Sequence, residues 1–158
     1  MMTKKKQSGF WAALVIFSLV GQIAWVMENM YFNVFIYKMF HATPEDISTM
    51  VSFSAIAATL TTVFMGALSD RLGKRKLFMW LGYTLWGVSI FCFVFLKKDL
   101  LAPLSPATGG AVAGIWLAIL LDCVMTFFGS SANDAAYNAW LTDSTDETNR
   151  VPQKASTL

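Results

Sequence analysis

Acidic side chains within apolar stretches are the residues of this chain with the most distinctive chemistry. Glu28, Asp122 and Asp134 each lie inside a long apolar run, whereas all twelve Lys and Arg residues fall outside these runs. An ionisable group at the centre of a bilayer costs about 2.5–3.5 kcal/mol and normally faces a cavity or a partner. No base within the runs can pair with these acids. We therefore expect them to face water, to bind a proton or cation, or to need a partner from elsewhere.

The last apolar run carries a repeat of polar residues. They recur every four positions, as Asp122, Thr126, Ser130, Asp134 and Asn138. Side chains four apart lie near one face of an α-helix and drift by about 40° per step. This predicts a slowly winding polar seam, as in the wall of an aqueous cavity. We take Asp134, Asn138 and Asp122 as candidates for proton or cation coupling. Thr126 and Ser130 are candidates for lining the cavity.

The first apolar run adds amides and a carboxylate to the predicted cavity. Gln22, Asn29 and Asn33 share one helix face, and Glu28 lies roughly a quarter-turn from it. We expect all four to line the cavity. The second run offers only hydroxyls, which can bond to their own helix backbone; they are Ser48, Ser52, Thr59 and Thr62. An alternative stays open for all these groups: they could simply join helices by hydrogen bonds.

Four apolar helices must position these side chains. With 158 residues, 56% of them hydrophobic and 14% charged, the chain is too apolar for an ordinary soluble domain. A bilayer requires about 20 helical residues per crossing, and the segments long enough are residues 10–37, 47–69, 77–96 and 111–141. We predict an all-α membrane protein with a four-helix transmembrane portion over residues 1–141. Residues 142–158 form a polar tail.

The basic residues predict the orientation. With the N-terminus inside, the cytoplasmic segments hold nine of them, namely Lys4, Lys5, Lys6, Arg71, Lys74, Arg75, Lys76, Arg150 and Lys154. The outer loops hold three, namely Lys38, Lys97 and Lys98. This bias predicts a multi-pass protein of the inner or plasma membrane with both termini cytoplasmic. The bases are scattered among loops and form no stripe, so we expect no nucleic-acid partner. No metal-ligand spacing, phosphate-binding loop or nucleophile–histidine pair is present, so we expect no enzyme and no cofactor.

The loop between the second and third segments carries a dense motif. Its defined positions are Gly66, Asp70, Arg71, Gly73, Lys74 and Arg75, followed by Lys76. Glycine at the turn suits a tight helix stop, because it accepts the left-handed conformation. The pattern resembles the G-x-x-x-D-[RK]-x-G-[RK]-[RK] signature between helices 2 and 3 of the major facilitator superfamily. The resemblance implies a gating role for this loop.

Residues 133–150, at the end of the last segment, resemble the end of helix 4 in the glycoside–pentoside–hexuronide sugar:cation symporters. Members of that family carry an acid there, then an aromatic residue, and then a D-x-T-like stretch that closes with an arginine. The resemblance implies helices 1–4 of a twelve-helix transporter, whose remainder is missing here. It further implies a sugar or glycoside substrate and a cation site at Asp134. Members of this family bring further acids from helix 2, where this chain has Ala58 and Thr62. Coupling to a proton and coupling to sodium both stay open.

Two other functions fit part of this pattern. A free-standing four-helix membrane protein could act as a scaffold without transporting anything. A small drug/proton exchanger could dimerise around a membrane glutamate, with Glu28 in that role. The loop motif at residues 66–76 argues against both.

We predict loops 70–76 and 143–154 in the cytoplasm, and loops 38–46 and 97–110 outside. Single cysteines placed at Ala42 and Thr145, with Cys92 and Cys123 replaced by serine, should therefore react with an impermeant thiol reagent from opposite sides. Labelling of both from the same side would show that the number of spans is wrong.

Overall fold

The computed structural model describes residues 4–143, with the side chains of residues 11–142, and these residues form long helical rods joined by short connections. The first rod comprises α1 (Lys4–Met27), the π-helical η1 (Glu28–Phe32) and α2 (Asn33–Phe40). The second and third are α3 (Pro44–Leu72) and α4 (Arg75–Cys92), the latter extended by a 3₁₀ turn, η2 (Phe93–Phe95). The last comprises α6 (Ala111–Gly129), the π-helical η5 (Ser130–Tyr137) and α7 (Asn138–Asp143).

All four rods are long and apolar enough to cross a membrane. This confirms the predicted all-α membrane protein. The first helix continues to Phe40, beyond the predicted end at residue 37, and the last reaches Asp143. The predicted outer loop at residues 97–110 contains the short helix α5 (Lys98–Leu101) and two 3₁₀ turns, Ala102–Leu104 and Pro106–Thr108. From residue 144 on, the predicted polar tail lies outside the described residues.

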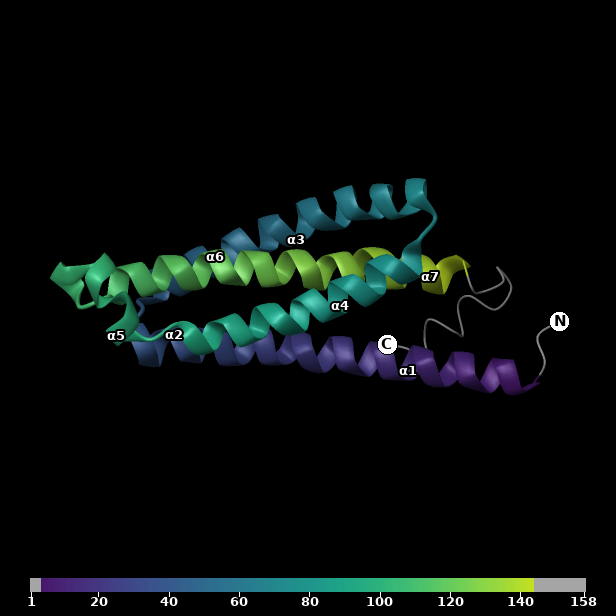
Figure 1. Ribbon diagram of the computed structural model, residues 1–158, viewed down its shortest axis with the longest axis horizontal. Helices are drawn as coiled ribbons and strands as arrows, with labels where there is room; N and C mark the ends of the chain where they lie inside the picture. The colour runs from purple at the N-terminus through teal and green to yellow at the C-terminus, as the bar shows by residue number, and fades with distance from the viewer. Residues whose placement is uncertain (1–3, 144–158) are drawn as a thin grey trace.

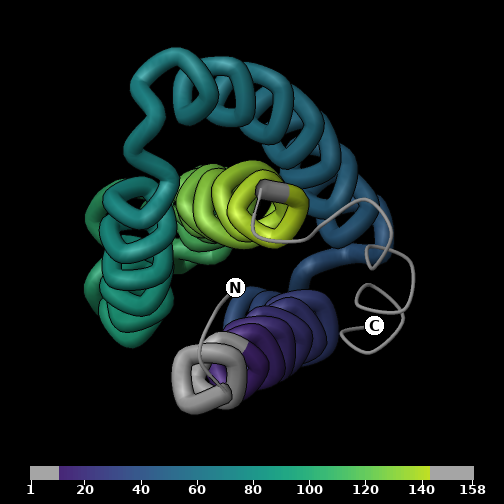
Figure 2. Tube along the Cα trace, turned by 90° about the vertical axis from the view of Figure 1, so that its right-hand side faces the viewer, coloured from purple at the N-terminus to yellow at the C-terminus, as the bar shows by residue number. Residues whose placement is uncertain are grey.

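The last rod is the centre of the bundle. In the end-on view it lies between α3, α4 and the first rod, which surround it (Figure 2). Both α3 and α4 pack along α6 and η5, and α2 packs on α6. Seen from the side, the rods run along the long axis, and α1 and α3 diverge toward the end that carries the α3–α4 loop (Figure 1). Side chains of the last helix are therefore placed between helices from several parts of the chain.

Local sequence explains where α3 begins and ends. Thr43 caps its start, because its hydroxyl accepts from the Asp46 amide at 3.2 Å and its own amide donates to the Asp46 carboxylate at 2.8 Å. Pro44 follows at the first helical position, where its missing N–H costs nothing. Gly73 ends the helix in the left-handed conformation, with φ 61° and its amide bonded to the Ser69 carbonyl at 3.0 Å. The predicted tight stop at Gly73 is thus present.

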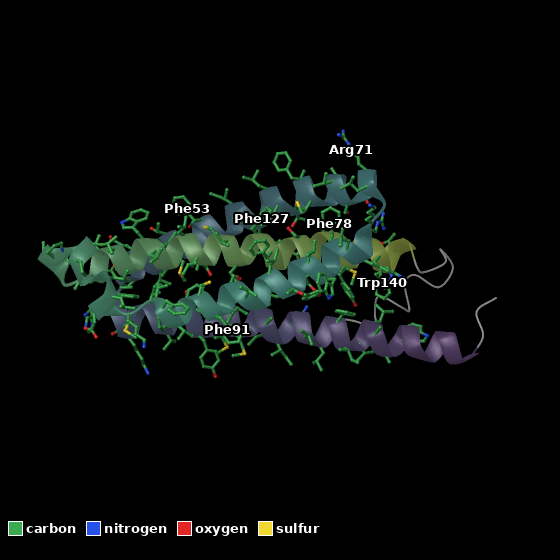
Figure 3. The ribbon with its side chains drawn as sticks, viewed as in Figure 1. Phe53, Arg71, Phe78, Phe91, Phe127 and Trp140 are labelled. Carbon is green, nitrogen blue, oxygen red and sulfur yellow. The ribbon has the colours of Figure 1, made fainter. Side chains whose placement is uncertain are left out.

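Buried side chains form two apolar clusters, one toward each end of the bundle. Trp86, Phe93 and Met125 belong to the larger cluster, beside the α2–α3 connection, and Leu14, Met79 and Tyr137 belong to the smaller one. Other large apolar side chains face outward, such as Phe53 and Phe91 (Figure 3). Lipid covers such side chains in a membrane protein, so their exposure agrees with a spanning bundle.

Two glycines of α4 give a test of this packing. A Cβ on Gly82 would lie 2.7 Å from the Cβ of Ala132 in η5, whereas a Cβ on Gly87 would meet nothing within 4 Å. We expect Gly82→Ala to destabilise the bundle by about 1–3 kcal/mol through overpacking. Gly87→Ala should be neutral or stabilising by up to about 1 kcal/mol, because alanine favours the helix. Thermal unfolding in detergent measures both, and equal effects of the two changes would contradict this packing.

Candidate functional site

Two carboxylates from different rods meet hydroxyl groups in the interior of the bundle. The hydroxyl of Thr126 on α6 donates to the Oε1 atom of Glu28 at 3.0 Å. The hydroxyl of Ser54 on α3 donates to the Oδ2 atom of Asp122, which is itself buried. Glu28 and Asp122 line the same pocket, whereas Asp134 does not. Glu28 and Asp122, with their two hydroxyl donors, therefore form one polar cluster, which we call the acid pair.

The acid pair lines a pocket of about 200 Å³ between the first rod, α3 and α6. Trp25, Asn29 and Asn33 line its first-rod side. The α3 side is mostly apolar, and it includes Met50, Val51, Ala55 and Ala58. A small pocket with a few converging polar groups and an aromatic side chain is typical of a site for a small molecule.

One buried polar atom at this site has no hydrogen-bond partner within the described part of the chain. The Nδ2 atom of Asn33 donates to the Asn29 carbonyl at 2.7 Å, but its Oδ1 atom accepts nothing. An unsatisfied buried polar group costs about 1–3 kcal/mol. This unsatisfied acceptor beside the pocket indicates where a ligand or water would bind.

Two π-helical segments flank the acid pair. The first, η1, begins at Glu28 itself, and η5 begins four residues after Thr126. Such turns are rare and often occur at functional sites, because the wider turn redirects side chains. Sequence analysis did not predict either of them, since no residue pattern distinguishes a π turn from an α turn.

The predicted polar seam divides at η5. Asp122, Thr126 and Ser130 are buried, whereas Asp134 and Asn138 are exposed. The Asn138 side chain donates to the Asp134 carbonyl at 3.0 Å, so these two residues bond locally. The coupling role of Asp122, Asp134 and Asn138 stays a prediction. The structure places Asp122 beside Glu28 at the pocket, whereas Asp134 and Asn138 do not line it, because the π-helical turns of η5 interrupt the regular α-helix that the seam assumed.

The remaining cavity candidates divide in the same way. The pocket is lined by four of these candidates, namely Glu28, Asn29, Asn33 and Thr126. It is not lined by Gln22, which is exposed, or by Ser130, which is buried elsewhere. Among the hydroxyls of α3, the side chains of Ser52, Thr59 and Thr62 bond to carbonyls of their own helix, as expected. Ser54 reaches across to Asp122 and was missed. A lone serine gives no signal in the sequence beyond its place in an apolar run.

Near the other end, polar contacts join η5 of the last rod both to α4 and to the first rod. The Tyr83 hydroxyl on α4 donates to the Oδ1 atom of Asn133 at 3.0 Å. Asn133 packs on Gly21, where an added Cβ would lie 2.6 Å from that Oδ1 atom. The buried Tyr137 hydroxyl donates to the Leu14 carbonyl at 3.1 Å. Together these contacts fix the first rod against η5.

The α3–α4 loop is attached to the last rod through Arg75. Its guanidinium pairs with Asp70 at 2.8 Å and also donates to the Ala139 carbonyl. Arg71 points away from the bundle (Figure 3), and a Cβ on Gly66 would meet nothing within 4 Å. Lys74 and Lys76 are exposed. The gating role of this loop stays a prediction. Among residues 11–142, no three His, Cys, Asp or Glu side chains gather as they would around a metal ion.

Comparison with known proteins gives a match over most of the chain. The sequence model of the Major Facilitator Superfamily matches residues 8–152. An uncharacterized protein of Aquifex aeolicus (strain VF5) is 29% identical over 84 residues, which are 53% of this chain and 22% of that protein. The chain thus covers less than two thirds of the length of this curated relative. No solved structure matches the chain.

The two bonds of Arg75 predict unequal effects of mutation. Its ion pair with Asp70 is partly exposed, with side-chain exposures of 21% and 60%, so Asp70→Asn should cost about 0–1 kcal/mol. Arg75→Gln also removes the charged donor from the Ala139 carbonyl, and we expect a loss of about 1.5–3 kcal/mol. Thermal unfolding of both variants in detergent tests this order. A larger loss for Asp70→Asn would show that the bond to Ala139 contributes little.

Proposed function

The chain belongs to the Major Facilitator Superfamily, and we propose on that basis that it takes part in secondary active transport, with the acid pair as its proton-coupling site. Transport would follow alternating access, in which a midplane site opens to either side of the membrane in turn. The observation that supports this proposal is that buried Asp122 and half-buried Glu28 line one pocket within an apolar bundle. Carboxyl groups that stay within a membrane commonly belong to proton relays.

A proton fits this site better than sodium does. Sodium sites in transporters use backbone carbonyls that an unwound helix segment releases. Here the rods pass the acid pair without unwinding, because the π segments connect directly to the α-helices on either side. Each carboxylate already accepts a hydroxyl hydrogen bond, from Thr126 or Ser54. Protonation of one carboxyl group would remove the repulsion between the two acids without requiring any further ligand.

For the substrate we propose a sugar or glycoside. Carboxylates accept hydrogen bonds from hydroxyl groups, and side-chain amides both accept and donate them. The pocket combines the acid pair with Asn29 and Asn33. The free Oδ1 atom of Asn33 would accept from one substrate hydroxyl. Trp25 offers an apolar ring face at the same pocket. The resemblance of residues 133–150 to sugar:cation symporters supports the same substrate class.

Asp134, which sequence analysis predicted as the residue that couples a proton or cation to transport, is the alternative to the acid pair. Its exposed carboxylate lies where further parts of a transporter could contact it. Glu28, by contrast, already has partners within the chain, which argues against a small exchanger built around that glutamate alone. The choice between the acid pair and Asp134 is therefore open to a direct test.

We expect Glu28→Gln and Asp122→Asn to abolish accumulation of a labelled sugar against its gradient in cells that express the gene. Exchange of internal for external sugar should persist, because it needs no net proton movement. Glu45→Gln is the matched control, since Glu45 is an exposed acid at the start of α3 outside the pocket. It should accumulate sugar normally.

Asp134→Asn completes the experiment, with membrane insertion verified for every variant. If Asp134→Asn alone abolishes accumulation, the coupling site is Asp134 and the acid pair is structural. Accumulation by a well-inserted Glu28→Gln/Asp122→Asn double variant would refute proton coupling at the pair. A uniform lack of sugar uptake, including by the unmodified protein, would overturn the substrate class.

A further inference from the structure

Two hollows meet at the end of the bundle that carries the α3–α4 loop. The first, which we call the basic hollow, has a volume of about 830 Å³ and is lined by Lys74, Arg75, Lys76, Asp70 and Trp140. The second, the aromatic groove, has a volume of about 320 Å³ and lies between α1 and α4. Lys76 and Trp140 line both. The hollows therefore adjoin, one with a charged lining and the other with a mostly apolar lining.

The basic hollow has an excess of positive charge. Its three bases face one acid, and that acid, Asp70, already pairs with Arg75. Lys74 and Lys76 keep exposed side chains at the same hollow. A loop at the end of a spanning helix lies at the level of the lipid headgroups, and basic pockets there bind anionic headgroups.

The aromatic groove continues from the basic hollow into the membrane. Phe17 of α1 contacts Tyr83 of α4 at the groove, with ring centroids 5.5 Å apart, and the Trp80 side chain beside them is 67% exposed. Lys76, Trp80 and Thr84 follow one face of α4 at four-residue spacing, so the groove extends about 12 Å from the lysine at 1.5 Å per residue. Half of a hydrocarbon core of about 30 Å is about 15 Å. The groove thus has almost the depth of one leaflet.

We propose that the joined hollows form a binding site for an anionic phospholipid. Lys74 and Lys76 hold the phosphate, and one acyl chain lies in the aromatic groove between α1 and α4. A free phosphate ion would leave the groove empty, and a neutral lipid would leave the two lysines without a counter-charge. This proposal is independent of the transported substrate, because neither hollow includes the acid pair.

The test is native mass spectrometry of the full chain in detergent with phosphatidylglycerol or phosphatidylcholine added. The unmodified chain should retain phosphatidylglycerol preferentially. Lys74→Gln/Lys76→Gln should lower that preference roughly 30-fold, at about 1 kcal/mol per lysine near the surface. Lys97→Gln/Lys98→Gln removes two charges at the opposite end of α4 and is the matched control, which should keep the preference.

The groove is tested separately by Ala13→Phe, which fills it beside Phe17 while leaving the lysines in place. This variant should retain less of both lipids. An unchanged preference in Lys74→Gln/Lys76→Gln would overturn the proposal, and so would an equal loss in the Lys97→Gln/Lys98→Gln control. If Ala13→Phe retained as much lipid as the unmodified chain, the proposed binding of an acyl chain in the aromatic groove would be refuted.

If a variant fails to fold, competition experiments on the unmodified chain test whether the site binds a lipid or only an anion. Glycerophosphate and inorganic phosphate, which have no acyl chain, should not displace bound phosphatidylglycerol, whereas lysophosphatidylglycerol should. Displacement by phosphate alone would mean a simple anion site. A dimer that retains no lipid would mean that a second copy of the chain covers the groove.

Discussion

Hydrogen bonds from hydroxyl groups to two carboxylates between the helices are the interactions on which the arrangement of this bundle depends. Thr126 bonds to Glu28 and Ser54 bonds to Asp122, so the first rod, α3 and α6 meet at one point. Elsewhere these helices contact one another through apolar surfaces that would pack equally well against lipid. The acids cannot turn toward lipid without losing these partners, at a cost of several kcal/mol for each charge. The pocket exists because the helices are held in this way.

The four helices were predictable because lipid imposes simple rules on sequence. Apolar length defines each span, and Thr43, Pro44 and Gly73 mark the ends of α3 with ordinary capping chemistry. The acids at positions 28 and 122 were recognised as site candidates for the same reason, since their burial in an apolar run is costly. Which acid pairs with which was not predictable. Pairing depends on helix rotation, and the π turns at Glu28–Phe32 and Ser130–Tyr137 alter rotation without a mark in the sequence.

The two ends of the bundle differ in what holds them together. Near the α2–α3 connection, large buried side chains such as Phe93, Met125 and Trp86 fill the space between helices. Toward the α3–α4 loop, α1 and α3 diverge (Figure 1), and polar contacts join the last rod to its neighbours: Tyr83 of α4 bonds to Asn133, and Tyr137 bonds to the Leu14 carbonyl of the first rod. Such contacts have defined geometry and can be broken singly. The loop end is therefore the end where helices can change neighbours at the smaller cost.

Arg75 determines which parts would move together in such a change. Its bonds to Asp70 and to the Ala139 carbonyl connect the end of α3, the start of α4 and α7. These three segments form one mechanical unit, because separating them would break a charged hydrogen bond in partly apolar surroundings. The first rod is outside this unit, and it contacts η5 through Asn133, which packs on Gly21, and through the bond from Tyr137 to the Leu14 carbonyl. A shift of α1 along η5 would therefore move Glu28 relative to Asp122 without breaking the two bonds of Arg75.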